Sequence, residues 1–505
     1  MTTTESKIAI VGAGVFGLST ALHLNKQGYK DVTVFDYQPY DQNAYNPSEG
    51  CDSASADVNK IYRCSYGDEI EYQDLALSGR PIWLEWNELL RSTPADQLPK
   101  GLTPEDDLFV PCGFLRISSG GDLSDYDKEC LVQLEKAGLR KYQHVLASDA
   151  HISNENDMDR LWDLERRLPA HWEEKVYALK QAGGGGLDGF IDTSAGLTYA
   201  DKSCAWARHL CEKAGVKFVL GPESGKLDDL LIDGKEGNDR KVVGLRTVDG
   251  KEYRADVVVV ACGGWTPSVV SEASELLETT AGSVCTITLP EDRPDLWDKF
   301  SPERFPVWSY GLTGHNSPEY GGFYGFPRTR EGKIKIGRIS TPKTKYTADR
   351  AVNLPKKAIT YLKQVIGEIF PELTGIGITD TRMCWYTDSI DNSFVIDYVP
   401  GYSDSLFVAS GGSGHGFKFL PVLGKHVVNA LEKKQDQFTP LWHWRSRVPG
   451  HHANGLEEGE MSGRNLATLE MAEEKDWKWI DKGEVKVGKD VEDITTGVNG
   501  VAIEA

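Results

Sequence analysis

The sequence has no run of about 18 apolar residues, the length that a helix needs to cross a bilayer. Its first residues, MTTTESKIAIVGAG, lack the basic stretch and apolar run of a secretory signal. Its last residues, Ile503 to Ala505, differ from the Ser-Lys-Leu type of peroxisomal address. We therefore expect a soluble cytoplasmic protein with no membrane partner.

Positive charge and paired cysteines are also scarce. The formal net charge of −20 would repel a phosphate backbone or an anionic lipid, and no local basic patch offsets it. The nine cysteines include no CxxC pair that could hold zinc, and their odd number fits a reducing compartment. Neither a coiled coil nor an apolar surface stripe is evident. We expect no metal, no nucleic-acid partner, and a monomer that acts on a small molecule.

The length of the chain predicts two connected domains, because 505 residues exceed the size at which a single core usually stops growing. The content of 40% hydrophobic and 26% charged residues is that of a globular protein. Regular patterning fades after about residue 440. The polar, acidic tail from 441 to 505 is predicted either to wrap over the surface or to lack fixed structure.

The first 36 residues have the pattern of a βαβ unit. The apolar run Lys7 to Val11 predicts a buried parallel strand, and the glycine-rich stretch Gly12 to Gly17 follows it. A helix with an apolar face from Leu18 to Leu24 comes next, and then a strand from Val32 to Asp36. The glycine-rich turn therefore lies between a strand and a helix.

This context turns the weak GxGxxG motif into a dinucleotide-binding signal. Gly12 permits the tight turn, Gly14 lets the backbone approach a pyrophosphate, and Gly17 lets the helix pack closely. The helix N-terminus favours negative charge, and the carboxylate at the end of the second strand can accept from ribose hydroxyls. The predicted contacts in this unit are Gly12, Gly14, Val15, Phe16, Gly17 and Asp36.

The motif alone would also fit NAD. Two distant buried strands, Ala255 to Ala261 and Leu406 to Ala409, also end in glycines, at Gly263 and Gly411. Together with a motif at the extreme N-terminus, this layout resembles FAD-binding amine oxidases. The sequence therefore favours FAD over NAD.

Three later segments make the resemblance specific. They are SADVNKIYRCSYG at 55–67, FYGFPRTREGKIKIG at 323–337, and CWYT at 384–387 followed by GSGHGFKF at 412–419. Their order and spacing resemble the family of monomeric sarcosine oxidase, fructosyl-amino-acid oxidase (amadoriase) and pipecolate oxidase, in its fungal form. The resemblance extends over nearly the whole chain, to about Leu431.

The resemblance implies roles for five active-site residues. Arg63 and Lys418 would anchor the substrate carboxylate, and Tyr324 and Tyr386 would line the active site. Lys335 would activate oxygen, since a cation there stabilises the negative charge that develops on oxygen. The plainer alternative places Lys335 on the solvent-facing side of a strand.

The resemblance also implies that FAD is attached covalently through Cys384. A buried free cysteine is ordinarily just a small hydrophobe, so this prediction depends on the motifs that flank it. The other implied cofactor contacts are Asn59, Lys60, Val219, Gly263, Trp265, Gly412, Gly414, His415, Gly416, Phe417 and Lys418.

The implied fold is α/β, with a Rossmann-type FAD-binding domain interleaved with a catalytic domain on a mixed, largely antiparallel sheet. We assign residues 1–90, 195–280 and 381–440 to the FAD-binding domain. We assign residues 91–194 and 281–380 to the substrate-binding catalytic domain, and 441–505 to a C-terminal extension.

The implied function is oxidation of the C–N bond of an N-substituted amino acid, such as an N-methyl amino acid, with oxygen as acceptor. The products would be an imine or iminium and hydrogen peroxide, in a setting such as fungal alkaloid biosynthesis. A fructosyl-amino-acid, pipecolate or saccharopine-type oxidase is the alternative. A flavin dehydrogenase or a non-catalytic flavoprotein fits the motifs less well.

Two departures from the family pattern bear on the substrate. The pattern from Asp57 to Ile61 is shared with fructosyl-amino-acid oxidases, but His415 stands where these typically have arginine. Bacterial sarcosine oxidases have a histidine four residues after the oxygen-activating lysine, where this chain has Ile339. This mixture suggests a relative that acts on some other N-substituted amino acid.

Overall fold

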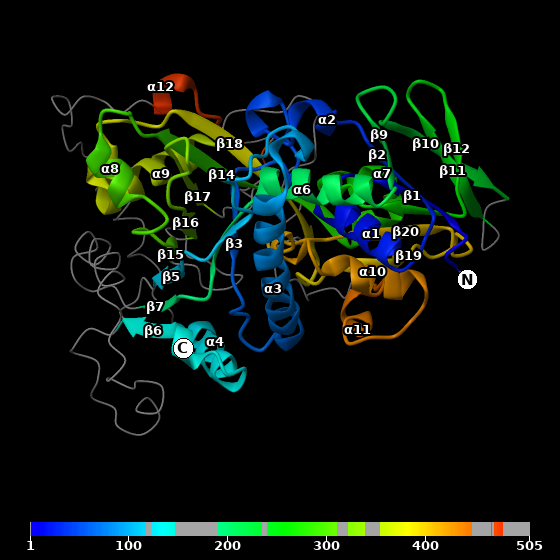
Figure 1. Ribbon diagram of the computed structural model, residues 1–505, viewed down its shortest axis with the longest axis horizontal. Coiled ribbons are helices and arrows are strands. Elements are labelled where there is room, and N and C mark those ends of the chain that lie inside the picture. Colours follow the sequence, from blue (N-terminus) through cyan, green and yellow to red (C-terminus); the bar gives the residue numbers. More distant parts are fainter. Residues whose placement is uncertain are drawn as a thin grey trace, which may run out of the picture.

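The structure, a computed structural model, describes residues 2–117, 123–146, 189–234, 240–310, 322–338, 354–446, 466 and 469–477. Ile339 and most of the predicted C-terminal extension lie outside the described residues. Two large sheets dominate the fold (Figure 1), with the six-stranded sheet on the right, the eight-stranded sheet on the left and the long helix α3 (Ile70–Ser92) between them.

The six-stranded sheet has the order β19-β20-β13-β1-β2-β9. The apolar strands β1 (Lys7–Val11), β2 (Asp31–Asp36) and β13 (Val257–Val260) pair in parallel at its centre. Its other strands are β9 (Lys217–Leu220), β19 (Val395–Tyr398) and β20 (Leu406–Ser410), of which only β19 is antiparallel to its neighbour. The parallel strands end at the same edge, where the glycine-rich loops that follow them meet.

Helices α1 (Val15–Lys26), α6 (Ala200–Lys213) and α10 (Leu423–Leu431) pack together in the core cluster on one face of this sheet. A Cβ atom on Gly424 would lie 1.9 Å from the Ser19 carbonyl oxygen, so the close approach of α10 to α1 requires glycine. The other face packs against a small antiparallel sheet that the sequence did not predict. Its strands are β10 (Leu227–Asp233), β11 (Lys241–Thr247) and β12 (Glu252–Arg254).

The eight-stranded sheet has the order β18-β14-β17-β16-β15-β5-β7-β6, and it is antiparallel except where β5 pairs with β15. This mixed sheet confirms the predicted fold class. Its strands are β5 (Phe114–Ile117), β6 (Gln143–Leu146), β7 (Gly189–Asp192), β14 (Leu277–Thr288), β15 (Val307–Tyr310), β16 (Phe323–Gly325), β17 (Lys333–Arg338) and β18 (Asp380–Ser389). The domain boundaries predicted at 280/281 and 380/381 fall inside β14 and β18. These two strands pair with each other along their length, so both belong to the eight-stranded sheet.

Smaller elements cover and connect the two sheets. Helix α9 (Lys356–Ile369) packs its apolar face on β14 and β17, and a piece of the C-terminal extension pairs beside it through the bridge between Pro355 and Met471. A three-stranded sheet carries part of the predicted site. Its strands are β3 (Asn59–Tyr62), β4 (Phe109–Val110) and β8 (Gly196–Tyr199), and helix α4 (Asp125–Lys136) lies near β6.

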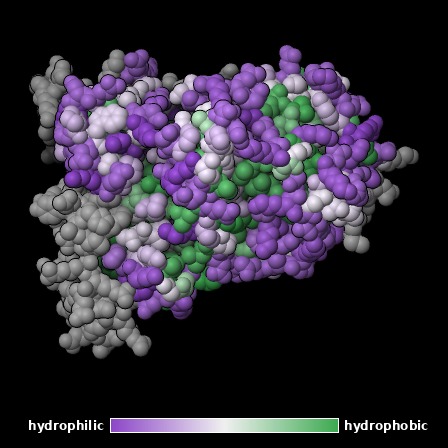
Figure 2. All heavy atoms as spheres, in the orientation of Figure 1, coloured by the Kyte–Doolittle hydropathy of each residue, from purple (hydrophilic) through white to green (hydrophobic). Residues whose placement is uncertain are grey.

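Hydrophilic residues cover most of the face seen in Figure 2, and hydrophobic residues gather around its middle. None of the helices in the described ranges combines the length and the apolar character that crossing a bilayer requires.

Candidate active site

A cavity of about 1400 Å³ runs between the two large sheets. Single-ligand pockets typically measure about 300–1,000 Å³, so the cavity has room for a cofactor and a substrate together. Most of the predicted site residues line it: Gly12, Gly14, Val15, Phe16, Asp36, Asn59, Lys60, Arg63, Gly263, Trp265, Tyr324, Lys335, Tyr386, Gly412, Gly414, His415, Gly416, Phe417 and Lys418.

The loop between β1 and α1 has the geometry of a dinucleotide cradle. Gly12 has a φ of +108°, and a Cβ atom on Gly17 would lie 1.8 Å from the Gly12 carbonyl oxygen. A Cβ on Gly14 would approach the Ser55 hydroxyl to 2.9 Å, and that hydroxyl accepts from the Val15 N–H at 2.9 Å. The backbone here leaves the helix N-terminus open to an anionic group.

Asp36 lies at the end of β2 and lines the same end of the cavity. Its carboxylate accepts from the backbone N–H groups of Ala13 at 2.7 Å and Gln38 at 2.9 Å. Burial raises the pKa of Asp36 to about 6, against the lowering effect of these two donors. Val219 packs beside the neighbouring β10 sheet, and the cavity is lined instead by the turn at 225–227.

The side-chain amide of Asn59 can form hydrogen bonds with a bound ligand. Its side chain is fully buried and lines the cavity, and neither amide atom has a hydrogen-bond partner among the described residues. Orphaned buried amides are costly, so a polar group bound in the cavity would satisfy this one. Together with the glycine cradle, Asn59 fits a large polar cofactor such as FAD.

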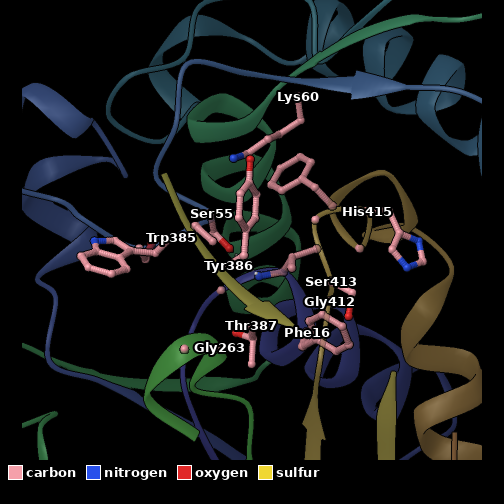
Figure 3. Close-up of a pocket in the computed structure, with 18 of the residues that line it drawn as sticks. Phe16, Ser55, Lys60, Gly263, Trp385, Tyr386, Thr387, Gly412, Ser413 and His415 are labelled. Carbon is pink, nitrogen blue, oxygen red and sulfur yellow. Dashed lines mark hydrogen bonds between the residues drawn. The ribbon is translucent and has the colours of Figure 1, made fainter. Parts of the chain in front are cut away.

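Figure 3 shows how the two sheets meet at the cavity. The ring of Tyr386, on β18, points toward Lys60, and Gly263 and Gly412 lie near its base. These glycines belong to the loops after β13 and β20. The cavity therefore joins the strand ends of one sheet to a strand face of the other.

A compact charged cluster lies beneath this part of the cavity. One oxygen of Asp57 lies 2.7 Å from Lys60 Nζ and 2.6 Å from Lys335 Nζ. Lys335 also donates to the Asn59 carbonyl at 2.8 Å. Lys60 Nζ lies 3.3 Å from the sulfur of Cys384, which is buried and directly precedes the cavity-lining residues Trp385 and Tyr386.

The pKa shifts in the cluster come from burial and from this sharing of one carboxylate. Burial alone would raise the pKa of Asp57, but the charges of Lys335 and Lys60 outweigh it and hold that pKa far below its usual value. Burial lowers the pKa of Lys335, and Asp57 offsets only part of the effect. Asp57 is therefore the counter-ion that keeps these ammonium groups in a buried position.

Asp57→Asn should destabilise the protein by about 3–5 kcal/mol, because it leaves two buried ammonium groups without a carboxylate. The loss would appear as a lower midpoint of thermal unfolding. Asp228→Asn, which makes the same chemical change at the exposed ion pair with Arg246, should leave the midpoint almost unchanged. Equal midpoints for the two variants would contradict the role given to Asp57.

Arg63 and Lys418 also line the cavity. Arg63 donates to the Ser65 carbonyl and lies over the Tyr66 ring, 4.2 Å from its centre. Lys418 Nζ donates to the Tyr66 hydroxyl and to the His415 carbonyl, both at 2.7 Å. Neither cation has a carboxylate within 4 Å in the described part of the chain. Burial, reinforced by Arg63, lowers the pKa of Lys418 well below its usual value.

Three contributors to the site were missed as site residues. Ser55 and Asp57 lie inside the motif at 55–67 but were not predicted to take part in the site, although they contact the cradle and the lysines. Arg382 donates to the carbonyl groups of Cys51, Ser53 and Ala56, which shapes the loop that carries both. Strand alternation could have identified Arg382, because it lies two residues before Cys384 on the same side of β18.

Comparison with known proteins places these features in a family. The profile of the family described as FAD dependent oxidoreductase matches residues 7–430. L-saccharopine oxidase of Schizosaccharomyces pombe is 26% identical over 461 residues, covering 87% of this chain and 93% of that protein. Monomeric sarcosine oxidase of a Bacillus species is 23% identical over 425 residues, covering 84% of this chain and 92% of that protein.

Solved structures show the same fold. Fructosamine oxidase (amadoriase II) from Aspergillus fumigatus superposes with a TM-score of 0.65 at 26% identity, covering 88% of this chain and 91% of that chain. Fructosyl peptide oxidase from E. terrenum superposes with a TM-score of 0.69 at 23% identity, covering 94% of this chain and 100% of that chain.

Proposed function

The chain belongs to the family of FAD dependent oxidoreductases, and on that premise we propose that it oxidises the C–N bond of an N-substituted amino acid. Oxygen would be the electron acceptor, and the products would be an imine or iminium and hydrogen peroxide. We further propose that it works as a cytoplasmic monomer. Its relatives include oxidases named for saccharopine, sarcosine and N-methyl-L-tryptophan, all of which are N-substituted amino acids.

The observation that carries this proposal is the pair of cations without carboxylate partners, Arg63 and Lys418. Buried charges are costly unless they are paired, so two cations facing one cavity favour an anionic ligand. A substrate carboxylate between them would supply the missing charge. The aromatic side chains of Phe114, Tyr126 and Phe326 also line the cavity and suit the rest of a small organic molecule.

FAD would be held along the cavity by the glycine cradle, Asp36, Asn59 and the loops after β13 and β20. When bound, it accepts two electrons and a proton from the carbon beside the amine nitrogen, and oxygen takes the electrons from it. Lys335 would hold a positive charge where oxygen gains negative charge. Asp57 fixes that ammonium group in place, 2.6 Å from its own oxygen.

The substrate amine must be neutral, because its lone pair assists the departure of the hydride. Arg63 and Lys418, as nearby cations, disfavour the protonated amine, so the reaction requires no dedicated protein base. Burial raises the pKa of the Tyr324 and Tyr386 phenols well above its usual value. These two tyrosines would therefore act as neutral walls and hydrogen-bond donors.

We also propose that Cys384 bonds covalently to the flavin. Its sulfur contacts Lys60 at 3.3 Å and Asp57 at 3.7 Å, beside the cavity wall formed by Tyr386. Seven of the other eight cysteines are buried, and Cys262 lines the cavity. Cys262 is therefore the alternative attachment site that an experiment must exclude.

Removing the carboxylate from a good substrate tests the proposed function. For an N-methyl amino acid found by screening, the decarboxylated amine should lose at least about tenfold in kcat/KM, since a charged hydrogen bond contributes about 1.5–3 kcal/mol. Oxygen consumption by the purified holoenzyme measures the rates. Equal kcat/KM for acid and amine would exclude Arg63 and Lys418 as carboxylate anchors.

Fructosyl amino acids are the second candidate substrates, because the structural relatives include amadoriases. A screen that contains fructosyl-glycine, saccharopine, pipecolate and N-methyl amino acids separates these possibilities. An enzyme that reduces an artificial acceptor but consumes no oxygen would instead be a dehydrogenase.

A further inference from the structure

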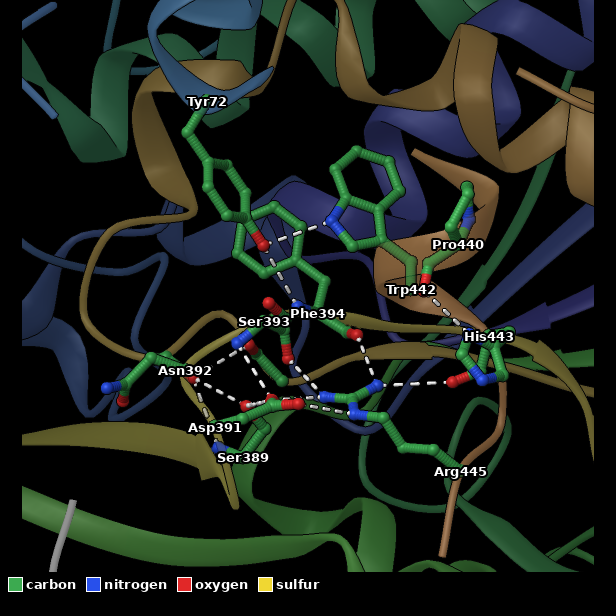
Figure 4. A network of polar contacts seen from close by, with 12 residues as sticks. Tyr72, Ser389, Asp391, Asn392, Ser393, Phe394, Pro440, Trp442, His443 and Arg445 are labelled. Carbon is green, nitrogen blue, oxygen red and sulfur yellow. Dashed lines mark hydrogen bonds and ion pairs between the residues drawn. The ribbon is translucent and has the colours of Figure 1, made fainter. Parts of the chain in front are cut away.

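The chain segment 438–446 packs against the loop at 390–394 that follows β18. Arg445 Nε donates to the Asp391 carboxylate at 2.7 Å. Its terminal nitrogens donate to the carbonyl oxygens of Ser393 at 2.9 Å and Phe394 at 3.0 Å (Figure 4). One side chain of the C-terminal segment therefore binds three residues of the loop.

A hydrogen bond connects this loop to His415, which lines the cavity. The Asn392 carbonyl lies 3.1 Å from His415 Nε2, and a carbonyl can only accept, so Nε2 carries the proton. In the neutral ring, Nδ1 is then an acceptor, and the Tyr66 hydroxyl donates to it at 3.1 Å. The Tyr66 oxygen in turn accepts from Lys418 Nζ at 2.7 Å. The chain of hydrogen bonds thus runs from the loop to the buried ammonium group.

Trp442 provides a second, separate support. Its indole N–H donates to the Tyr72 hydroxyl at 3.0 Å, and this hydroxyl also accepts from the Phe394 N–H at 3.2 Å. The Tyr72 ring stacks on Tyr66 with 5.6 Å between centres, and it meets His415 edge-on at 4.8 Å. Two side chains of the same segment therefore converge on the pair of residues that holds Lys418.

We propose that the segment 438–446 aims the substrate-binding ammonium group of Lys418, with Arg445 as a positioning residue. Two of the three N–H donors of Lys418 are used by Tyr66 and by the His415 carbonyl, so these two contacts set the direction of the third. A shift of the loop would turn His415 and Tyr66, and with them the donor that faces the ligand. This inference rests on the proposed function, in which Lys418 binds a carboxylate.

Acetate binding to the holoenzyme tests the proposal without turnover. Acetate should change the flavin absorbance of the wild-type protein, and Arg445→Gln should weaken its binding by about tenfold, the scale of one hydrogen bond. KM for the substrate should rise by a similar factor while kcat changes little. Arg293→Gln, at an exposed arginine that makes a two-point contact with Asp295, is the matched control and should change neither.

A double-mutant cycle separates positioning from general loosening. In a His415→Asn background, Arg445→Gln should weaken acetate binding by less than about twofold. The reason is that the hydrogen bonds of His415, which connect the loop to Tyr66 and Lys418, are already lost. Full additivity of the two effects would overturn the proposal. Tyr72→Phe, which removes one oxygen atom, should weaken acetate binding by about threefold. It is the second test of the proposal if Arg445→Gln loses its flavin.

The outcomes also distinguish this inference from the proposed function. If acetate does not change the flavin absorbance of the wild-type protein, carboxylate anchoring is overturned, and this inference with it. A wild-type response that Arg445→Gln and Tyr72→Phe both leave unchanged would overturn the positioning role alone.

Discussion

Cys384→Ala should release all of the flavin into the supernatant when the protein is precipitated with acid, whereas the wild-type precipitate should stay yellow. The alanine variant should still fold and bind FAD reversibly, because the cradle, Asp36 and Asn59 do not depend on the sulfur. A tryptic peptide containing Cys384 should be heavier by one FAD in the wild type. Absorbance of the two fractions and mass spectrometry of the peptide measure the result.

Cys262→Ala is the matched control, because Cys262 lines the cavity. Its sulfur donates to the Val11 carbonyl at 3.3 Å, and burial raises the pKa of its thiol, which suppresses the reactive thiolate. This variant should therefore keep its flavin in the precipitate. Free flavin in the wild-type supernatant, or a flavin peptide that contains Cys262, would show that Cys384 is not the attachment site.

Local patterning was sufficient to predict the first βαβ unit and the buried strands β13 and β20 of the six-stranded sheet. The strand from Lys7 to Val11 occurs as predicted, because a continuous apolar run suits a parallel strand buried on both faces. Pairing between distant segments was not visible in the same way. Residues 196–199, directly before the helix that begins at Ala200, pair with β3 from more than a hundred residues earlier in the chain. The pairing of β14 with β18 was missed for the same reason.

The identities of the site residues were easier to predict than their contacts. The resemblance singled out Lys60, Lys335 and Cys384, but it did not show that Asp57 joins all three. Lys335 and Cys384 are separated from Asp57 and Lys60 by many strands, so only the folded chain brings the two pairs within hydrogen-bonding distance. The role of the C-terminal segment was equally hidden, since Arg445 has no motif around it and two of its three partners in the loop are backbone carbonyl groups that any residue could supply.

Lys335→Met should leave anaerobic reduction of the flavin by substrate within a few-fold of wild type, and should slow reoxidation by oxygen about 100- to 1,000-fold. That range is the usual effect of removing one preorganised electrostatic stabiliser. The variant should fold, because Asp57 keeps its ion pair with Lys60 at 2.7 Å when the other ammonium group is lost. Stopped-flow absorbance measures the two half-reactions separately.

Lys333→Met provides the control for this prediction on the same strand. Lys333 lies two residues earlier on β17, is only half-buried and does not line the cavity. Both half-reactions should keep wild-type rates in this variant, whereas a general effect of removing a strand lysine would slow it as well. The size of the difference follows from position: Lys335 is 2% exposed and bound to Asp57 and the Asn59 carbonyl, so its charge is fixed at the cavity wall. Normal reoxidation in Lys335→Met would mean that another cation stabilises the negative charge on oxygen. Lys60 is the other cation of the cluster.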